Sequence, residues 1–237
     1  MDEFILEGLK KLLPLAPGIN GKDEYFNSAV LVLLMFMGGE YHFVFEKRAA
    51  QIRQAGEICF PGGKFDPERD ADYQEAAVRE TEEELGAKAE KIKVIGPLDT
   101  VISTTGTTVD AFLGVLDVDG LENLKINTAE VERIFTIPVA YFEKNEPEIY
   151  QVTLEVHPSY INQSGEEVIT FPAKELGLPD RYHRQWGNVQ SNIYVYRVDD
   201  VTIWGITARL IRDVAVKIRS LGGTKGKTIS SGQKKKE

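Results

Sequence analysis

The sequence predicts an α/β (α+β) protein in which one mixed domain carries additions at both ends of the 237-residue chain. Three observations predict this class. Two apolar stretches flank a glycine pair near residue 38, which is typical of a strand, a turn and a strand. A polar stretch leads into a helix-like segment that ends at Gly86. The last apolar stretch has helical periodicity. Because no internal repeat is visible, we expect one domain rather than two.

The N-terminal segment, residues 1–25, predicts a short amphipathic helix. Apolar side chains recur at helical spacing from Glu3 to Leu15, and Pro14 and Pro17 stop the run. We expect this helix to pack on the domain or on a partner. Because the start is acidic and has no long apolar run, we do not expect it to be a secretory signal.

The main domain is expected to span residues 26–221 and to begin with a hairpin. Ala29–Met37 and Tyr41–Glu46 predict its strands, and Gly38-Gly39 supplies the positive φ that hairpin turns need. The run Ala29–Met37 is about half as long as a membrane helix, so we interpret it as a buried strand. Ala50–Phe60 then predicts a loop or short strand that leads to Pro61-Gly62-Gly63.

The next element is the most regular helix that the sequence predicts, from about Tyr73 to Leu85. Pro67 to Asp72 is polar and turn-rich, and either Asp70 or Asp72 is suited to cap the helix N-terminus. Gly86 is the expected C-terminal stop.

Further strands are expected in three segments: Lys91–Ile95, Thr108–Leu116 and Ile149–Val156. Glu130–Ala140 predicts a short helix or turn that enters a strand limited by Pro138.

The chain then predicts a last hairpin and a last helix. Val189–Val198 and Thr202–Trp204 alternate in polarity around the turn Asp199-Asp200. Gly205–Leu221 predicts a helix with one apolar stripe, formed by Ile206, Leu210, Ile211 and Val214. Residues 222–237 are rich in Gly, Ser, Thr and Lys and are predicted to be a disordered tail.

Charge and cysteine content exclude several function classes. The formal net charge is −9, and the lysine-rich tail carries five lysines and one glutamate, so the remainder is more acidic still. An acidic body is a poor nonspecific partner for nucleic acid or anionic membrane. Cys59 is the single cysteine, which excludes an intrachain disulfide and fits a reducing compartment. We therefore expect a cytoplasmic protein that binds neither nucleic acid nor membrane.

Four glutamates within five residues are the main functional signal. Glu80, Glu83 and Glu84 share one face of the predicted helix, whereas Glu82 turns away. Like charges at this spacing repel unless a cation lies between them. Mg²⁺ and Mn²⁺ prefer oxygen ligands, so Glu80 and Glu84, with Glu83 directly or through water, are candidate ligands. The Gly62 carbonyl is a further candidate. The competing interpretation is a solvated acidic helix face.

The segment that follows the glycine turn resembles the signature of Nudix hydrolases, G-x5-E-x7-R-E-U-x-E-E-x-G-U with U apolar. Gly63, Arg79, Glu80, Glu83, Glu84 and Gly86 carry the resemblance. Two departures stand out. Thr81 replaces an aliphatic residue, and fifteen residues rather than thirteen separate Gly63 from Arg79. The first signature glutamate is thereby displaced, and Glu68, Asp70 and Asp72 remain as candidates for its place.

The resemblance implies a Nudix α/β/α sandwich with a mixed β-sheet and a loop-helix-loop catalytic motif. It implies metal-dependent hydrolysis of a nucleoside diphosphate linked to another group. Under this reading Glu80, Glu83, Glu84 and Gly62 bind Mg²⁺ or Mn²⁺, and Arg79 orients the carboxylates. Gly62 and Gly63 let the pyrophosphate approach the backbone.

A second segment, Arg48 to Gly63, resembles the motif that precedes the signature in coenzyme A pyrophosphatases. It contains Arg48, Arg53, the pair Gly56-Glu57, and Phe60-Pro61-Gly62-Gly63. The resemblance implies cleavage of coenzyme A or acyl-coenzyme A to adenosine 3′,5′-bisphosphate and (acyl-)4′-phosphopantetheine. Arg48 and Arg53 are suited to bind phosphate oxygens. Glu130 is a candidate extra acid that binds metal or activates water, and it competes with a helix-capping role.

Two alternatives remain open at the level of sequence. The first is a Nudix pyrophosphatase that acts on ADP-ribose, NADH or another nucleoside diphosphate derivative. The second is a non-catalytic Nudix-like module that binds a nucleotide and regulates a partner. In each case the expected partner is a small-molecule nucleotide, and a homodimer is possible.

Overall fold

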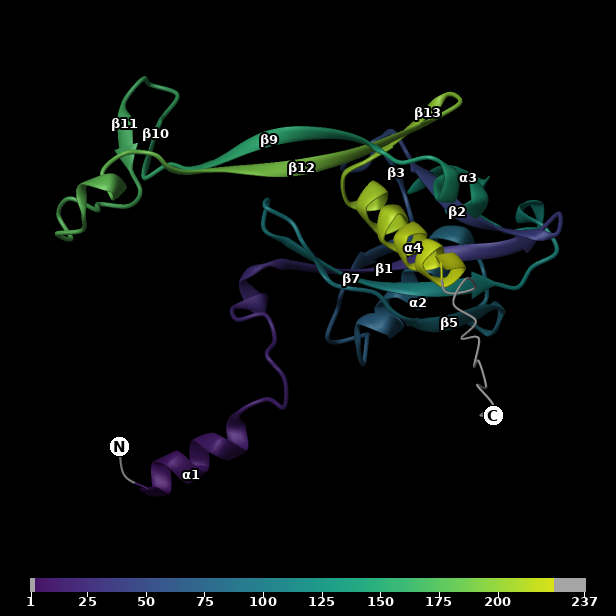
Figure 1. Ribbon diagram of the computed structural model, residues 1–237, viewed down its shortest axis with the longest axis horizontal. Helices are drawn as coiled ribbons and strands as arrows, with labels where there is room; N and C mark the ends of the chain where they lie inside the picture. The colour runs from purple at the N-terminus through teal and green to yellow at the C-terminus, as the bar shows by residue number, and fades with distance from the viewer. Residues whose placement is uncertain (1–2, 224–237) are drawn as a thin grey trace, which may run out of the picture.

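The computed structural model describes residues 3–223 and has at its centre an eight-stranded mixed sheet (Figure 1). The main path through this sheet is β3-β2-β1-β7-β5, and three more strands pair beside it. The strands are β1 (Phe26–Met37), β2 (Glu40–Arg48), β3 (Ile58–Cys59), β4 (Gly62–Lys64), β5 (Ile92–Pro97), β6 (Val101–Ile102), β7 (Thr107–Leu116) and β8 (Val131–Pro138).

Strand β1 organises the sheet because it pairs with three partners. It runs parallel to β7 over ten residue pairs, from Phe26↔Thr107 to Met35↔Leu116. Its end forms the predicted antiparallel hairpin with β2, and its beginning pairs antiparallel with β4. The last pairing places the glycine turn beside the centre of the sheet.

Helices cover both faces of the sheet, which gives the three layers of the predicted α/β/α sandwich (Figure 1). Helix α2 (Tyr73–Leu85) lies on one face, where Ala76, Ala77 and Leu85 pack against Leu31, Leu33 and Val44. Helices α3 (Val139–Lys144) and α4 (Gly205–Gly223) lie on the other. There Phe142, Ile211 and Val214 pack against Val32, Phe43 and Phe45. Side chains of β1 and β2 alternate between these two cores, as a pleated strand requires.

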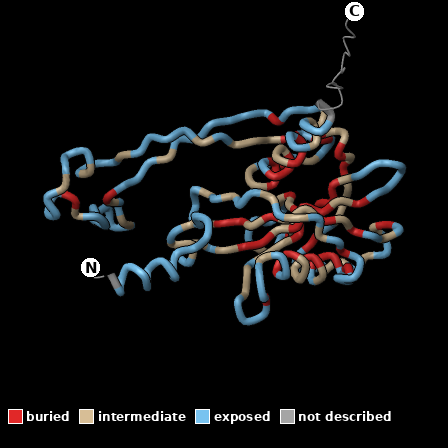
Figure 2. Tube along the Cα trace, turned by 60° about the horizontal axis from the view of Figure 1, so that its bottom comes forward, coloured by how far each residue is buried: buried red, intermediate tan, exposed pale blue. Residues whose placement is uncertain are grey.

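A long two-stranded ribbon extends from the domain, and much of its surface is exposed (Figures 1 and 2). It consists of β9 (Glu148–Val156) and β12 (Trp186–Val198), and β13 (Val201–Trp204) completes its sheet at the base. Strands β10 (Ser159–Ile161) and β11 (Glu167–Ile169) form a separate pair at its tip. The sequence predicted β9, β13 and most of β12, but neither the tip nor the projection from the domain.

Four short 3₁₀ helices complete the described elements: η1 (Lys22–Glu24), η2 (Ala89–Lys91), η3 (Leu121–Asn123) and η4 (Asp180–Tyr182). None of the helices within residues 3–223 is both long and apolar enough to cross a membrane.

Two of the predicted boundaries need correction. Helix α1 ends at Leu12 rather than Leu15, and it stands clear of the sheet (Figure 1). Leu6, Leu9 and Leu12 are 43, 42 and 81% exposed, so the expectation that this helix packs on the domain is wrong. Packing on a partner stays a prediction. Helix α4 continues to Gly223, two residues into the predicted tail, and the remainder of that tail lies outside the described residues.

Candidate active site

The glycine turn, Gly62-Gly63, is closely packed on two sides, by the backbone of β1 and by a side chain of α2. A Cβ on Gly62 would lie 2.3 Å from the Ala29 carbonyl oxygen, and the φ of +153° disfavours any L side chain. A Cβ on Gly63 would lie 2.4 to 2.7 Å from the three carboxyl atoms of Glu80. The Gly62 position therefore requires glycine because backbone atoms block a side chain there, whereas at Gly63 the obstacle is the carboxyl end of Glu80, which lies against the turn.

Local signals in the sequence fix the helix that carries the acidic residues. The Asp72 side chain accepts a hydrogen bond from the Glu75 N–H and caps the N-terminus of α2. Gly86 ends the helix in a left-handed conformation at φ 65°. Glu82 points away from the glycine turn, and its carboxylate accepts a hydrogen bond from the Ala89 N–H. The predicted separation of Glu82 from the other glutamates is thus confirmed.

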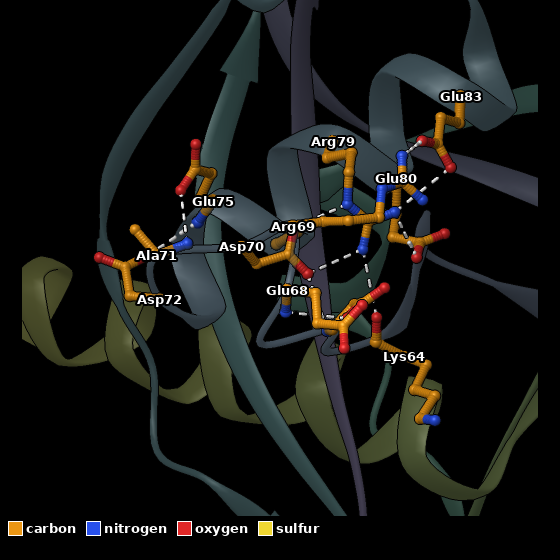
Figure 3. Close-up of polar contacts among 12 residues, drawn as sticks. Lys64, Glu68, Arg69, Asp70, Ala71, Asp72, Glu75, Arg79, Glu80 and Glu83 are labelled. Atoms are coloured by element: carbon orange, nitrogen blue, oxygen red, sulfur yellow. Dashed lines mark hydrogen bonds and ion pairs between the residues drawn. The ribbon is translucent and has the colours of Figure 1, made fainter.

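Arg79 donates hydrogen bonds to three acidic side chains and one backbone carbonyl of the candidate site (Figure 3). Its Nε and one terminal nitrogen bind the two oxygens of Asp70 at 2.7 and 2.9 Å. The other terminal nitrogen binds Glu80 at 2.8 Å and Glu83 at 3.2 Å. The Lys64 carbonyl accepts a further bond. A guanidinium is well suited to such a fork because its five donors are held in one plane.

Of the three acids on the lengthened loop, Asp70 is the one that pairs with this arginine. It is 5% exposed, and the Arg79 guanidinium holds its pKa below the usual range. Of the other candidates, Asp72 caps the helix and Glu68 is exposed. All three acids were candidates from the sequence, but which of them contacts α2 depends on the conformation of the loop, which the sequence pattern does not predict.

Two carboxyl groups that are far apart in the sequence meet beneath the glycine turn. Glu84 is 3% exposed, and one of its oxygens accepts a hydrogen bond from the Gly62 N–H at 2.9 Å. Glu46, on β2, is 1% exposed, and its charge acts on the Glu84 carboxyl, so the two groups lie near each other. Burial raises the pKa of both groups, and the charge of Glu46 raises that of Glu84 further. From the sequence, Glu46 was expected only to end a strand, and its burial beside Glu84 was not predicted.

The two remaining glutamates of the predicted cluster are held by arginines. Burial, followed by the charges of Glu83 and Glu130, raises the pKa of Glu80, while Arg79 lowers it. Glu83 is paired with both Arg69, at 2.5 Å, and Arg79. In residues 3–223 no three acidic, histidine or cysteine side chains converge closely enough to form a metal site as they stand. Cation binding therefore requires Glu80 and Glu83 to turn from their arginines.

The residues present nevertheless fit a hard divalent cation. Glu46 and Glu84 are both buried and the charge of Glu46 acts on Glu84, and such a carboxylate pair is unfavourable without a cation or a shared proton. Glu80 lies one helical turn from Glu84 on the same face. The donor set is all oxygen, as Mg²⁺ and Mn²⁺ prefer.

Comparison with known proteins agrees with this geometry. Residues 26–156, more than half of the chain, match the model of the NUDIX domain. The chain belongs to the Nudix family.

Three curated proteins are similar in sequence to this chain. Nudix hydrolase 3 of Caenorhabditis elegans is 39% identical over 49% of this chain and 50% of its own length. The peroxisomal coenzyme A diphosphatase NUDT7 of Mus musculus is 33% identical over 60% and 56%. The mitochondrial coenzyme A diphosphatase NUDT8 of the same species is 32% identical over 68% and 71%. The chain thus spans about half the length of the first two.

Thr81, which departs from the Nudix signature, has a simple structural account. It is completely buried, and its hydroxyl donates a hydrogen bond to the Ala77 carbonyl one turn earlier. The methyl group can therefore face the core while the hydroxyl is satisfied within the helix. The departure leaves the acidic face of α2 undisturbed.

Of the two arginines predicted to bind substrate, Arg48 ends β2 and Arg53 lies on the loop between β2 and β3. Arg48 is half-buried, and its charge lowers the pKa of both Glu46 and Glu84, so its guanidinium lies near the acidic pair. Its Nε donates to the Arg53 carbonyl, which brings the two predicted arginines together. Arg53 is exposed. Glu130 is also exposed, and its charge acts on Glu46 and Glu80.

We predict that Asp70→Asn lowers stability by about 1–2 kcal/mol, because an amide cannot match both donors of Arg79. Asp70 has a depressed pKa, so its contribution is present above the unfolded carboxyl range and is lost as the pH falls through the folded pKa. Denaturant unfolding at pH 7 and pH 3 measures the difference. The control is Asp72→Asn, which removes the same charge two residues away but keeps a good helix cap. An equal effect of the two variants contradicts the assigned role.

We further predict that divalent cations stabilise the protein more as the pH rises. The pKa is raised to about 7 at Glu46 and to about 9 at Glu84. At low pH these carboxyl groups are protonated in both the folded and the unfolded protein, so they cost no stability. As the pH rises from the unfolded pKa through the folded values, they increasingly destabilise the cation-free fold. A cation binds the ionised pair, so its stabilising effect grows over the same window. Thermal unfolding with and without Mg²⁺ at pH 5.5 and 9 tests this, and a pH-independent shift contradicts it.

Proposed function

We propose that this protein is a metal-dependent Nudix pyrophosphatase that hydrolyses the diphosphate of coenzyme A or acyl-coenzyme A. The products are adenosine 3′,5′-bisphosphate and 4′-phosphopantetheine or its acyl form. The observation that carries the proposal is the buried carboxyl pair Glu46–Glu84 beneath the Gly62-Gly63 turn, with Glu80 one helical turn away.

The acidic residues of α2 support the choice of reaction. When bound, Mg²⁺ or Mn²⁺ neutralises charge on a diphosphate and activates water for attack on phosphorus. Glu80, Glu83 and Glu84 would hold the cation, with the Gly62 carbonyl as a further ligand. Arg79, anchored by Asp70, would fix the orientation of Glu80 and Glu83. The oxygen of the attacking water forms a new bond to phosphorus as the anhydride P–O bond breaks, so each product keeps one of the two phosphates of the diphosphate.

Other residues of this chain support the remaining steps. The Gly62-Gly63 turn has no side chain on its surface, so a diphosphate can approach the backbone. Glu130 is exposed and lies close enough to affect the pKa of Glu46 and Glu80, so it is a candidate to accept the proton of the attacking water.

The substrate class is supported by the loop that precedes the glycine turn. The Arg48 charge acts on the acidic pair, and its Nε donates to the Arg53 carbonyl, so the Arg53 backbone lies beside the Arg48 side chain. Coenzyme A carries a 3′-phosphate on its ribose, and guanidinium groups bind phosphate in a bidentate manner. Two of the mouse relatives are named as coenzyme A diphosphatases.

A comparison of coenzyme A with dephospho-coenzyme A tests the role of the arginines. We expect Arg48→Gln and Arg53→Gln to lower kcat/KM for coenzyme A by roughly 10-fold or more, because a charge-assisted contact is lost. The effect on dephospho-coenzyme A should be small, since it lacks the 3′-phosphate. Arg184→Gln, on an exposed segment of the ribbon tip, is the matched control. Equal losses with both substrates would exclude recognition of the 3′-phosphate.

The alternative substrates make a different prediction in the same assay. An enzyme for ADP-ribose or NADH would turn these over with a higher kcat/KM than coenzyme A. A non-catalytic regulator would bind nucleotides but cleave none of them under Mg²⁺ or Mn²⁺. Assays of the wild-type protein with each compound therefore distinguish the three candidate functions.

A further inference from the structure

Glu46 is the most unusual buried polar side chain in the described part of the protein. It is 1% exposed and lies on β2, which pairs with β3 and β8 at this position. One of its carboxyl oxygens accepts a hydrogen bond from the Cys59 thiol at 3.2 Å. The other oxygen accepts none from any residue in 3–223. A buried carboxyl oxygen without a donor is strongly unfavourable, so it calls for a partner outside the protein.

The pleat of β2 sets the direction in which Glu46 points. Phe43 and Phe45 face the core beneath α3 and α4, whereas Val44 faces the core beneath α2. Side chains alternate along a strand, so Glu46 shares the α2 face with Val44. Helix α2 packs on that face and carries Glu84, on which the charge of Glu46 acts. The unpartnered oxygen therefore belongs to the acidic cluster.

The charged groups around Glu46 and Glu84 have an excess of carboxylates over basic side chains, which favours the binding of a cation. Arg48 is the basic group whose charge acts on both members of the pair, while Glu80 and Glu130 add negative charge. Arg79, the other nearby base, is engaged by Asp70, Glu80 and Glu83. Across Glu46, Glu84, Glu80 and Glu130, the carboxylates thus outnumber the cationic groups that act on the pair.

We propose that Glu46 is a further carboxylate ligand of the divalent-cation site, supplied by β2 from outside the signature helix. The unpartnered oxygen binds the cation together with Glu84, and the Cys59 thiol holds the other oxygen in place. The inference rests on the proposed function, because it assumes that Glu80 and Glu84 bind a cation. It extends the set of ligands to a residue that the Nudix signature does not contain.

The role of Cys59 follows from the same geometry. The thiol donates to Glu46, and burial together with the neighbouring Glu46 charge raises its pKa, so it stays protonated. Cys59 is therefore a positioning residue that fixes the Glu46 rotamer. Serine preserves a donor at this position and alanine removes it.

The test is the affinity of the whole protein for Mn²⁺ alone, measured by calorimetry or by the loss of the free-ion EPR signal. We expect Glu46→Gln to weaken Mn²⁺ binding at least about 10-fold, since even outer-shell partners of a ligand have effects of this size. Glu40→Gln, the same substitution at the exposed start of β2, should bind Mn²⁺ like the parent. Glu46→Asp keeps the charge and should weaken binding less than Glu46→Gln. Cys59→Ala should weaken binding more than Cys59→Ser.

Far-UV circular dichroism and thermal unfolding without metal accompany each variant. If Glu46→Gln does not fold, Glu46→Asp and the Cys59 pair still decide the question. Equal Mn²⁺ affinity in the parent and a folded Glu46→Gln protein overturns the inference and leaves the proposed function intact. A parent that binds no Mn²⁺ overturns both.

Discussion

Glu84→Gln is expected to lower kcat for diphosphate hydrolysis by at least about 100-fold, the largest effect of any single charge removal in this protein. Glu84 is buried, accepts the Gly62 N–H and faces Glu46, so no neighbouring side chain can take its place. Glutamine retains an oxygen that can accept the same hydrogen bond. The fold should therefore persist while the cation loses a charged ligand.

Stability measurements distinguish this account from simple unfolding. Without metal, Glu84→Gln should be at least as stable as the parent near pH 8, because a neutral amide avoids the cost of burying an ionisable carboxyl group beside Glu46. Added Mg²⁺ should then raise its unfolding temperature less than it does in the parent. Glu82→Gln is the matched control on the same helix, since Glu82 points away and bonds the Ala89 N–H. Equal activity of the Glu84 and Glu82 variants would place the chemistry elsewhere.

Gly62→Ala is expected to destabilise the protein by about 3 kcal/mol or more and to remove activity. The new Cβ would meet the Ala29 carbonyl oxygen at 2.3 Å and the Val30 Cα at 2.7 Å. These are backbone atoms of the central strand, so they cannot rotate away as a side chain could. The pairing of β4 with β1 must shift, and the Gly62 N–H then moves from Glu84.

Gly106→Ala provides the control for conformational strain alone. Gly106 also has a positive φ, at 81°, but a Cβ there would meet nothing within 4 Å. We expect this variant to lose only about 1 kcal/mol. Chemical unfolding of both variants gives the comparison. Losses of similar size would mean that crowding at the glycine turn is not what requires Gly62.

The parts of the fold that the sequence predicted are those set by local patterns. The hairpin β1–β2, helix α2 between Asp72 and Gly86, and the turn into β8 before Pro138 follow from periodicity, caps and proline. The ribbon β9–β12 was predicted as strands, but its projection from the domain was not. Alternation of polar and apolar residues predicts which side chains share a face of a strand, but it does not predict where the strand lies relative to the domain.

The candidate site divides in the same manner. Glu80, Glu83 and Glu84 are contiguous with Arg79, so helical spacing alone places them on one face. Asp70 was one of three candidate acids, because loop geometry decides which of them reaches Arg79. Glu46 was missed because its meeting with Glu84 depends on the register of β2 against the sheet. A signal was present, since a glutamate in an otherwise apolar strand has to find a partner when buried.

The most direct test of the account is product analysis after incubation of coenzyme A with the wild-type protein and Mg²⁺ or Mn²⁺. We expect equal amounts of adenosine 3′,5′-bisphosphate and 4′-phosphopantetheine, and no product once EDTA removes the metal. We also expect a higher kcat/KM for coenzyme A than for ADP-ribose, NADH or diadenosine polyphosphates. Intact coenzyme A beside cleaved ADP-ribose would contradict the assigned substrate. Cleavage that continues in EDTA would contradict the metal site itself.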